Sequence, residues 1–101
     1  MPNPYDVTRT DTETTLTVRG SLDINTAAQL AEEIDKITAT KPKRVVVDLS
    51  QLDLIDSSGV AALVKLYKGV RAVGGAIELT GTRDQPLAIF KLLRMDKVFN
   101  I

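Results

Sequence analysis

Three consecutive valines in the segment "KRVVVDLS" (residues 43–50) place the strongest constraint on how this chain can fold. A run of adjacent apolar residues puts apolar side chains on both sides of a strand, so the segment is interpreted as a strand buried on both faces. Strands of this kind are usually parallel to their neighbours and flanked by helices, because parallel connections need a crossover. The valines therefore predict an α/β fold.

Helical periodicity occurs on both sides of this strand. The first helix is expected between Gly20 and Pro42 and should end near Thr40, because the residue before a proline avoids helical geometry. Thr26 has capping-box spacing to Gln29, and Asn25 is a rival N-cap. The second helix is expected from Ser57 to the Gly74-Gly75 stop. Apolar positions at helical spacing support both helices: Ala27, Leu30, Ala31, Ile34 and Ile37 in the first, and Val60, Leu63, Val64, Tyr67 and Val70 in the second.

The remaining segments complete an alternating order of elements. Residues 5–10 and 14–19 predict an edge hairpin whose second strand ends at Gly20, and residues 76–81 predict a further strand. Residues 84–95 predict a helix with Asp84 as cap and Pro86 in its first turn. The segment "KVFNI" (97–101) adds a short strand or an apolar tail. The order β-β-α-β-α-β-α over residues 1–101 predicts a single α/β domain, with a mixed sheet flanked by helices.

Composition excludes several classes of function. Lys+Arg number 13 and Asp+Glu number 13, which leaves no electrostatic footprint for nucleic acid or an anionic membrane. Cysteine and histidine are absent, so the common metal ligands and the usual general base are missing. Asp48, Asp53 and Asp56 lack calcium-loop spacing, and "GTRDQP" (81–86) lacks the phosphate-loop ending and is interpreted as a turn. We expect neither metal nor cofactor. The opening "MPNPYDVTR" has no secretory pattern, so a cytoplasmic location is expected.

Two adjacent serines, Ser57 and Ser58, stand where the second helix is expected to begin. One hydroxyl would cap the helix, and the other would lie at a helix N-terminus, where backbone N–H groups and the dipole favour an anion. A phosphate there adds about −1.5 to −2 charges beside Asp56. Such a charge would weaken the binding of a partner that covers this turn by roughly 30-fold to several thousand-fold. A nucleophilic serine would need a base or a Gly-x-Ser-x-Gly turn, and neither is found, so catalysis is not expected.

Asp23, in "GSLDINTA" (20–27), also precedes a helix, and two interpretations stay open from the residues. It is either a carboxylate that stabilises a helix N-terminus or a surface acid beside the serine turn. The second requires that the two turns emerge at the same edge of the sheet.

The segment "GSLDINTA" followed by "VVVDLSQLDLIDSSGVAALVKLYKGVRAVGGAIELTG" (45–81) resembles the STAS domains, and more narrowly the bacterial anti-anti-sigma factors. The resemblance covers roughly residues 5–99. It implies a mixed sheet flanked by helices and a non-enzymatic anti-sigma factor antagonist. In such proteins the first serine after the aspartate, here Ser57, is phosphorylated by a partner that is both anti-sigma factor and serine kinase. The unphosphorylated form binds this kinase, the phosphorylated form releases it, and a PP2C-type phosphatase restores the serine.

The resemblance also assigns roles to neighbouring positions. Asp23 matches the aspartate of a Gly-x-Leu-Asp motif near the phosphorylation site, and Ser58 is the runner-up acceptor. Many relatives continue into a last helix, whereas this chain stops at "VFNI". An accessory subunit of a membrane transporter, or a part of a stress-sensing complex, is the alternative function. A monomer or weak dimer is expected, and the predicted partner-binding positions are Asp23, Asp56, Ser58, Gly59 and Val60.

Overall fold

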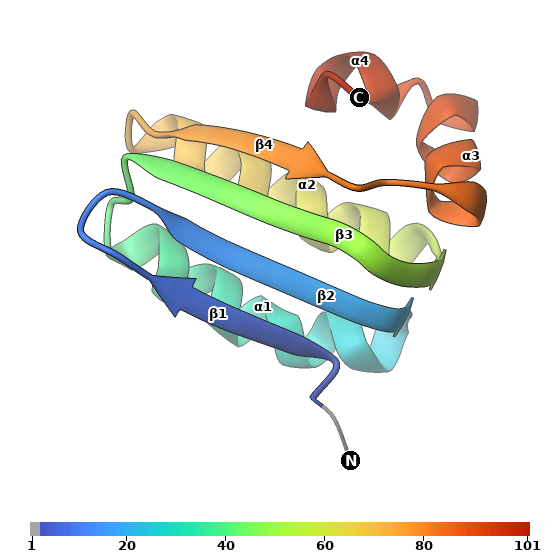
Figure 1. The fold of residues 1–101 in the computed structure, drawn as a ribbon, viewed down its shortest axis with the longest axis horizontal. Helices are drawn as coiled ribbons and strands as arrows, with labels where there is room; N and C mark the ends of the chain where they lie inside the picture. Colours follow the sequence, from blue (N-terminus) through green and yellow to red (C-terminus); the bar gives the residue numbers. More distant parts are fainter. Residues whose placement is uncertain (1–2) are drawn as a thin grey trace.

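A computed structural model describes residues 3–101 of the chain (Figure 1). Residues 1 and 2 lie outside the described residues. They belong to the opening segment, in which no secretory signal is expected. The strands are β1 (Tyr5–Arg9), β2 (Thr14–Leu22), β3 (Arg44–Ile55) and β4 (Ala76–Thr80). The helices are α1 (Ile24–Ala39), α2 (Ser57–Ala72), α3 (Asp84–Leu92) and α4 (Met95–Phe99).

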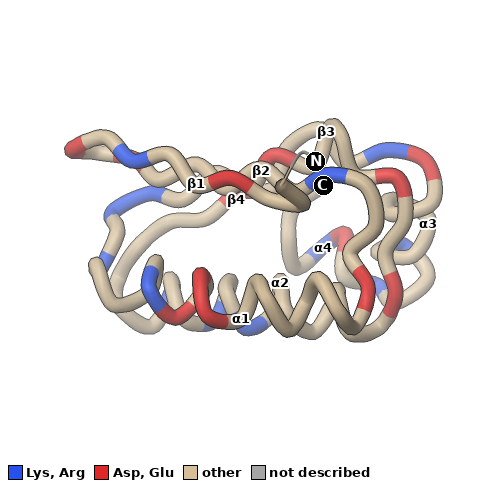
Figure 2. Tube along the Cα trace, turned by 90° about the horizontal axis from the view of Figure 1, so that it is seen from below, with Lys and Arg blue, Asp and Glu red and all other residues tan. Residues whose placement is uncertain are grey.

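The four strands form one mixed sheet in the order β1-β2-β3-β4. β1 and β2 pair as an antiparallel hairpin, whereas β2 with β3 and β3 with β4 are parallel. The crossovers α1 and α2 lie side by side on one face of the sheet, and α3 and α4 follow the end of β4 (Figures 1 and 2). This confirms the predicted α/β fold with a mixed sheet and helices, to which the structure adds α4. None of the helices in residues 3–101 has both the length and the apolar character needed to cross a bilayer.

The core fills the space between the sheet and the helix layer. The hairpin prediction is confirmed, as are the end of α1 at Thr40 and the stop of α2 at Gly74, which has φ +82°. The largest fully buried side chains come from strands β2 and β3 and helices α1, α2 and α3: Leu16, Leu22, Leu30, Ile34, Ile37, Leu49, Leu52, Leu63, Leu66 and Phe90.

The prediction that the valine strand is buried on both faces is wrong. Val45 and Val47 are fully buried against the helices, but Val46 points to the other face and is only half-buried. In the register of the sheet, Val46 lies between Thr15 on β2 and Glu78 on β4. No helix of the described part of the chain covers that face, and the neighbours of Val46 there are polar. The valine at this position is therefore explained by the preference of β-branched residues for strands rather than by burial.

Both central strands are longer than predicted. β2 does not end at Gly20 but continues to Leu22, and β3 extends beyond Ser50 to Ile55. Gly20 has φ +68°, a conformation that glycine adopts without strain, and the pairing register shifts directly after it. A second shift lies between Thr17 and Arg19, and at both shifts the extra residue is in β3. The shifts interrupt the alternation of buried and exposed residues in β3 but let the two strands pair as far as Leu22 and Ile55.

The C-terminal segment also differs from its prediction. α3 ends at Leu92, and Arg94 takes a left-handed conformation that redirects the chain into α4. In the segment expected as a strand or an apolar tail, residues 97–99 are therefore helical, and Ile101 packs against the core after the helix ends. Phe99 anchors it, because its ring packs edge-on against Tyr67 and Phe90 at centroid distances of 5.5 and 5.4 Å.

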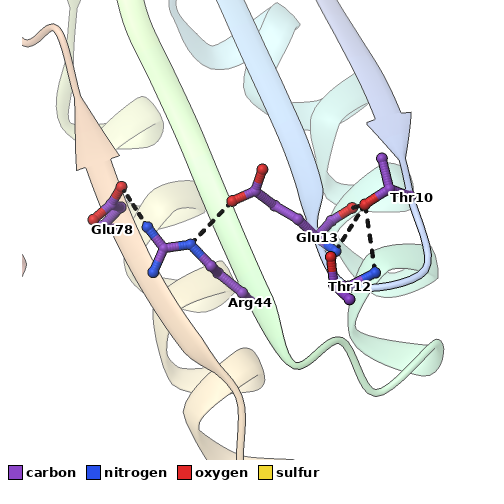
Figure 3. A network of polar contacts seen from close by, with 5 residues as sticks. All are labelled: Thr10, Thr12, Glu13, Arg44 and Glu78. Atoms are coloured by element: carbon purple, nitrogen blue, oxygen red, sulfur yellow. Dashed lines mark hydrogen bonds and ion pairs between the residues drawn. The ribbon is translucent and has the colours of Figure 1, made fainter.

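An arginine bridge joins β3, β4 and the loop residue directly before β2, at the end of the sheet where β3 begins (Figure 3). Arg44 Nε donates to Glu13 Oε1 at 3.0 Å, and a terminal nitrogen of Arg44 donates to Glu78 Oε1 at 2.9 Å. The hydrogen bond to Glu13, followed by the charge of Glu78, raises the pKa of Arg44. The Thr10 hydroxyl accepts from the backbone of Thr12 and Glu13, which fixes the hairpin loop beside the bridge.

Candidate functional site

Two parallel strands end side by side, and each is followed by an aspartate that begins a helix. Leu22 is paired with Ile55, so Asp23 and Asp56 follow at the same edge of the sheet. The backbone N–H of Asp56 donates to the Leu22 carbonyl at 3.3 Å, which ties the two turns together. The structure thus brings together the turns that the sequence could only suggest were neighbours.

Both helices at this edge are capped by the aspartates. Asp23 Oδ1 accepts from the backbone N–H of Asn25 at 3.0 Å and of Thr26 at 3.1 Å. The predicted caps Thr26 and Asn25 are therefore wrong: both lie within the first turn of α1 and donate to Asp23. In the same way Asp56, and neither serine, caps α2, because its Oδ1 accepts from the Gly59 N–H at 3.1 Å. An ionised carboxylate makes a stronger cap bond than a hydroxyl does.

The aspartate cap leaves the hydroxyls of both serines unused. No hydrogen bond of either side chain is found among residues 3–101. Ser57, the first residue of α2, is exposed, whereas Ser58 is half-buried. Both lie in the first turn, where backbone N–H groups without helical partners and the positive end of the dipole favour an anion.

Gly59 and Val60 hold the serine turn against the sheet. A Cβ atom on Gly59 would lie 2.5 Å from the Leu22 carbonyl oxygen and 2.7 Å from Ile55 Cγ1. Only glycine therefore lets the first turn of α2 approach the end of β2 so closely. The Val60 side chain is buried in the core, so it supports the turn and contributes little accessible surface.

Two hollows flank this turn. The first, of about 320 Å³, lies at the strand ends and is lined by Ser21, Leu22, Asp23, Leu54, Ile55, Asp56 and Gln85. The second is a shallow groove of about 420 Å³ between α1 and α2, lined by Ile24, Ala27, Ala28, Ala31, Ser58, Ala61, Ala62 and Lys65. Ile24 and Leu54 leave 68% and 53% of their surface exposed, so each hollow has an accessible apolar side chain in its lining.

Two residues that hydrogen-bond to the backbone of β3 near this edge, and that sequence reasoning missed, lie in the segment interpreted as a turn, residues 81–86. Gln85 pairs with the backbone of Ile55: its Oε1 accepts from the N–H at 2.9 Å, and its Nε2 donates to the carbonyl at 3.1 Å. Arg83 Nε donates to the Ser50 carbonyl at 2.9 Å. Hydrogen bonds to Asp84 and then to Asp53 raise the pKa of Arg83. Asp84, expected as the cap of α3, lies within its first turn and makes no cap bond. No pattern in the sequence indicates these contacts.

The acidic residues do not form a metal centre in the described part of the chain. Asp48, Asp53 and Asp56 are distributed along β3 and the following turn, and no group of three or more potential ligands gathers within residues 3–101. The Asp48 carboxylate instead accepts from the backbone N–H of Ser50 at 2.9 Å. The chemistry that this edge offers is an exposed hydroxyl, that of Ser57, at an edge of the sheet that also carries the carboxylates of Asp23 and Asp56 and exposed apolar side chains.

Comparisons with known proteins agree with this geometry. The family model described as "Mlab, STAS domain" matches residues 5–100. Anti-sigma-F factor antagonist RsfB of Mycobacterium tuberculosis is 28% identical over 88 residues, which cover 85% of this chain and 70% of that protein.

Solved structures show the same arrangement of elements. The crystal structure of an anti-sigma factor antagonist from Mycobacterium paratuberculosis superposes with a TM-score of 0.80 at 25% identity, covering 94% of this chain and 80% of the other. The Bacillus cell fate determinant SpoIIAA in its phosphorylated form superposes with a TM-score of 0.76 at 18% identity, covering 92% and 86%. The second likeness is one of fold alone.

Proposed function

Because this chain belongs to the STAS domain family, we propose that it is an anti-sigma factor antagonist controlled by phosphorylation of Ser57. Unphosphorylated, the chain binds a protein that is both anti-sigma factor and serine kinase, and this binding releases a sigma factor. Phosphorylation of Ser57 ends the binding, and a PP2C-type phosphatase restores it. The antagonist acts in the cytoplasm, as one domain, and performs no catalysis itself.

One observation carries the proposal: Asp56 caps α2, so the Ser57 hydroxyl is left exposed and free at the start of the helix. A kinase must reach the acceptor oxygen, and a capping hydroxyl would be occupied by a backbone N–H. Ser58 is less accessible because it is half-buried in the groove between α1 and α2. This difference favours Ser57 over Ser58 as the acceptor.

The charges at this edge suit a switch. A phosphate on Ser57 would gain about 0.3–1 kcal/mol from the dipole of α2, so the fold tolerates it. It would also add about −1.5 to −2 charges beside Asp23 and Asp56. A partner surface shaped to cover two carboxylates and a neutral serine would then meet roughly twice the negative charge, which opposes binding.

The exposed aliphatic residues supply the surface for a partner. Ile24 lines the groove between α1 and α2 together with Ser58, and Leu54 lines the hollow at the strand ends together with Asp56, so each shares a hollow with a neighbour of Ser57 in the chain. Burial of these side chains would supply the affinity, and the charge on Ser57 would control it. Asp56, Ser58 and Gly59 shape the turn that is presented, and Val60 supports it from the core.

The decisive experiment incubates the protein with ATP and each anti-sigma-type serine kinase of its organism. Intact mass and site mapping are compared for the wild type, Ser57→Ala and Ser58→Ala. We expect a gain of one phosphate that is lost in Ser57→Ala and retained in Ser58→Ala. The phosphorylated protein should then no longer bind the kinase, and a PP2C-type phosphatase should restore binding.

Two outcomes would contradict the proposal. Phosphate on Ser58 in the wild type would mean that Ser58, and not Ser57, is the acceptor. If no kinase modifies the chain while a transporter ATPase co-purifies with it in stoichiometric amount, the alternative of an accessory subunit replaces the switch.

A further inference from the structure

We infer that Gln85 is a positioning residue that holds the end of β3, and with it the Ser57 turn, in place. The link to phosphorylation rests on the function proposed above, whereas the structural effect can be measured without a kinase. Gln85 lies at the start of α3, 28 positions after Ser57 in the chain, and does not touch the acceptor itself.

The need for such a residue follows from the unequal lengths of the strands. β4 pairs with β3 only from Arg44 to Asp48, although β3 continues to Ile55. On its other side β3 is paired with β2 up to its last residue. The outer edge of β3 beyond Asp48 therefore has no neighbouring strand, and its backbone groups need other partners.

Gln85 takes the place of the missing strand at Ile55, the last residue of β3. Its amide accepts from the Ile55 N–H and donates to the Ile55 carbonyl, the same two bonds that a neighbouring strand would make. Arg83 donates a hydrogen bond to the Ser50 carbonyl, which lies closer to the start of β3 on the same edge. Asp56, the next residue after Ile55, is held from the opposite side by the Leu22 carbonyl.

Gln85 is itself fixed by its surroundings. The next residue, Pro86, is buried, and one turn later Phe90 is buried in the core, where it packs against Phe99. The amide is therefore presented from a rigid element rather than from a loose loop. Because α2 begins two residues after Ile55, loss of this support would let the start of the helix, including Ser57, move relative to the sheet.

The test uses hydrogen exchange of backbone amides, followed by NMR, in the wild type, Gln85→Met and Gln85→Glu. Methionine keeps the length of the side chain without its hydrogen bonds. Glutamate keeps the shape but sets a negative oxygen against the Ile55 carbonyl. In Gln85→Met, which removes both hydrogen bonds, we expect the Ile55 amide to exchange about 5- to 30-fold faster. Gln85→Glu keeps an acceptor for the Ile55 N–H and loses only the donor to the Ile55 carbonyl, so its exchange rate should lie between those of the wild type and Gln85→Met. Asp56 and Gly59 should exchange faster to a smaller degree, and Val47, in the doubly paired part of β3, should be unchanged.

Gln51→Met is the matched control. Gln51 is an exposed glutamine on the same strand, and its side chain makes no hydrogen bond among residues 3–101, so exchange at Ile55 should stay at the wild-type rate. Wild-type exchange at Ile55 in Gln85→Met would overturn the inference, because the size of the side chain rather than its hydrogen bonds would then hold the strand.

The second readout is phosphorylation by the kinase that modifies Ser57. We expect kcat/KM for Gln85→Met as substrate to fall about 5- to 30-fold, with KM for ATP unchanged, because fewer molecules present the turn in reactive geometry. Equal kcat/KM for wild type and variant would overturn the positioning role even if exchange at Ile55 changes. If no kinase phosphorylates the wild type, the proposed function fails, and exchange alone decides whether Gln85 holds the turn.

Discussion

The carboxylate of Asp56 accepts the backbone N–H of Gly59 at 3.1 Å, so an aspartate rather than a serine begins the helix that carries Ser57 and Ser58. One carboxylate thereby serves two purposes. It satisfies the N-terminus of α2, and it frees both hydroxyls for other chemistry. This separation of cap and acceptor can be tested by stability measurements that need no partner.

Asp56→Ala should lower the free energy of unfolding by about 1 kcal/mol, within the range found for lost N-caps. Asp56→Asn should cost less than half of that, because asparagine caps almost equally well. Ser57→Ala should change stability by less than about 0.5 kcal/mol, as expected for an exposed side chain without a partner. Urea unfolding of the three variants measures these differences. A larger loss in Ser57→Ala than in Asp56→Ala would show that the serine is the cap after all.

Gly59→Ala should be one of the most destabilising small substitutions in the chain. The added methyl group would meet the Leu22 carbonyl at 2.5 Å and the side chains of Ile55 and Leu22 at 2.7 and 2.8 Å. Relief requires a shift of α2 away from β2, at a cost of about 1–3 kcal/mol or more. Thermal unfolding should show the loss directly.

Gly69→Ala in the same helix is the control for Gly59→Ala. Its methyl group would meet only the side chain of Thr38, with the nearest atom at 2.9 Å. Since that side chain can move and alanine favours helix by about 1 kcal/mol over glycine, the change should be much smaller or even favourable. Equal losses at the two glycines would contradict the close contact between α2 and the end of β2.

Much of the fold could be predicted because it follows from local patterns. Apolar periodicity located α1 and α2, and Pro42 and Gly74 marked where they end. The uncovered face of the sheet could not be predicted, because the side chain of Val46 has the same character whether a helix or solvent lies above it. The extension of β3 was hidden by two register shifts, because beyond Leu49 its buried positions, Leu52 and Ile55, recur every three residues instead of every two. The extension of β2 was hidden by Gly20, a poor strand former.

Val46 and Val47 provide a direct test of the uncovered face. Val47→Thr places a hydroxyl among fully buried side chains and should cost about 1–3 kcal/mol. Val46→Thr keeps β-branching on the half-buried face, beside Thr15 and Glu78, and should cost less than about 0.5 kcal/mol. Urea unfolding of the two variants measures the difference. Similar losses would mean that the face of Val46 is covered in solution, for example by a second copy of the chain.

Phe99 should be essential for the C-terminal helix. It is only 3% exposed, and its ring contacts both Tyr67 and Phe90. Phe99→Ala should lower the free energy of unfolding by about 3 kcal/mol, because it leaves a cavity between the two rings. Val98→Ala, at a 45% exposed neighbour, should cost less than about 0.5 kcal/mol. A small loss in Phe99→Ala would show that α4 contributes little to the fold.

In the candidate site, too, features formed by residues close together in the sequence could be predicted, whereas long-range contacts could not. The Asp-Ser-Ser-Gly turn was visible because its residues are adjacent, and the place of Asp23 beside it required only that two parallel strands end together. The support from Gln85 could not be predicted, because a glutamine four positions after a turn glycine has no local signature. Its role arises from the difference in length between β3 and β4, which is a property of the assembled sheet.

Asp23→Asn should separate the structural and functional roles of this carboxylate. Asparagine can still accept from the backbone of Asn25 and Thr26, so the free energy of unfolding should change by less than about 0.5 kcal/mol. Binding to the kinase that phosphorylates Ser57 should weaken about three- to tenfold, because a half-buried charge at the proposed contact is lost. Glu32→Gln, at an exposed position on α1, is the control and should bind normally. Calorimetric titration measures both affinities. Wild-type affinity in Asp23→Asn would mean that Asp23 serves only as the cap of α1 and that the partner contacts the Ser57 turn from its other side.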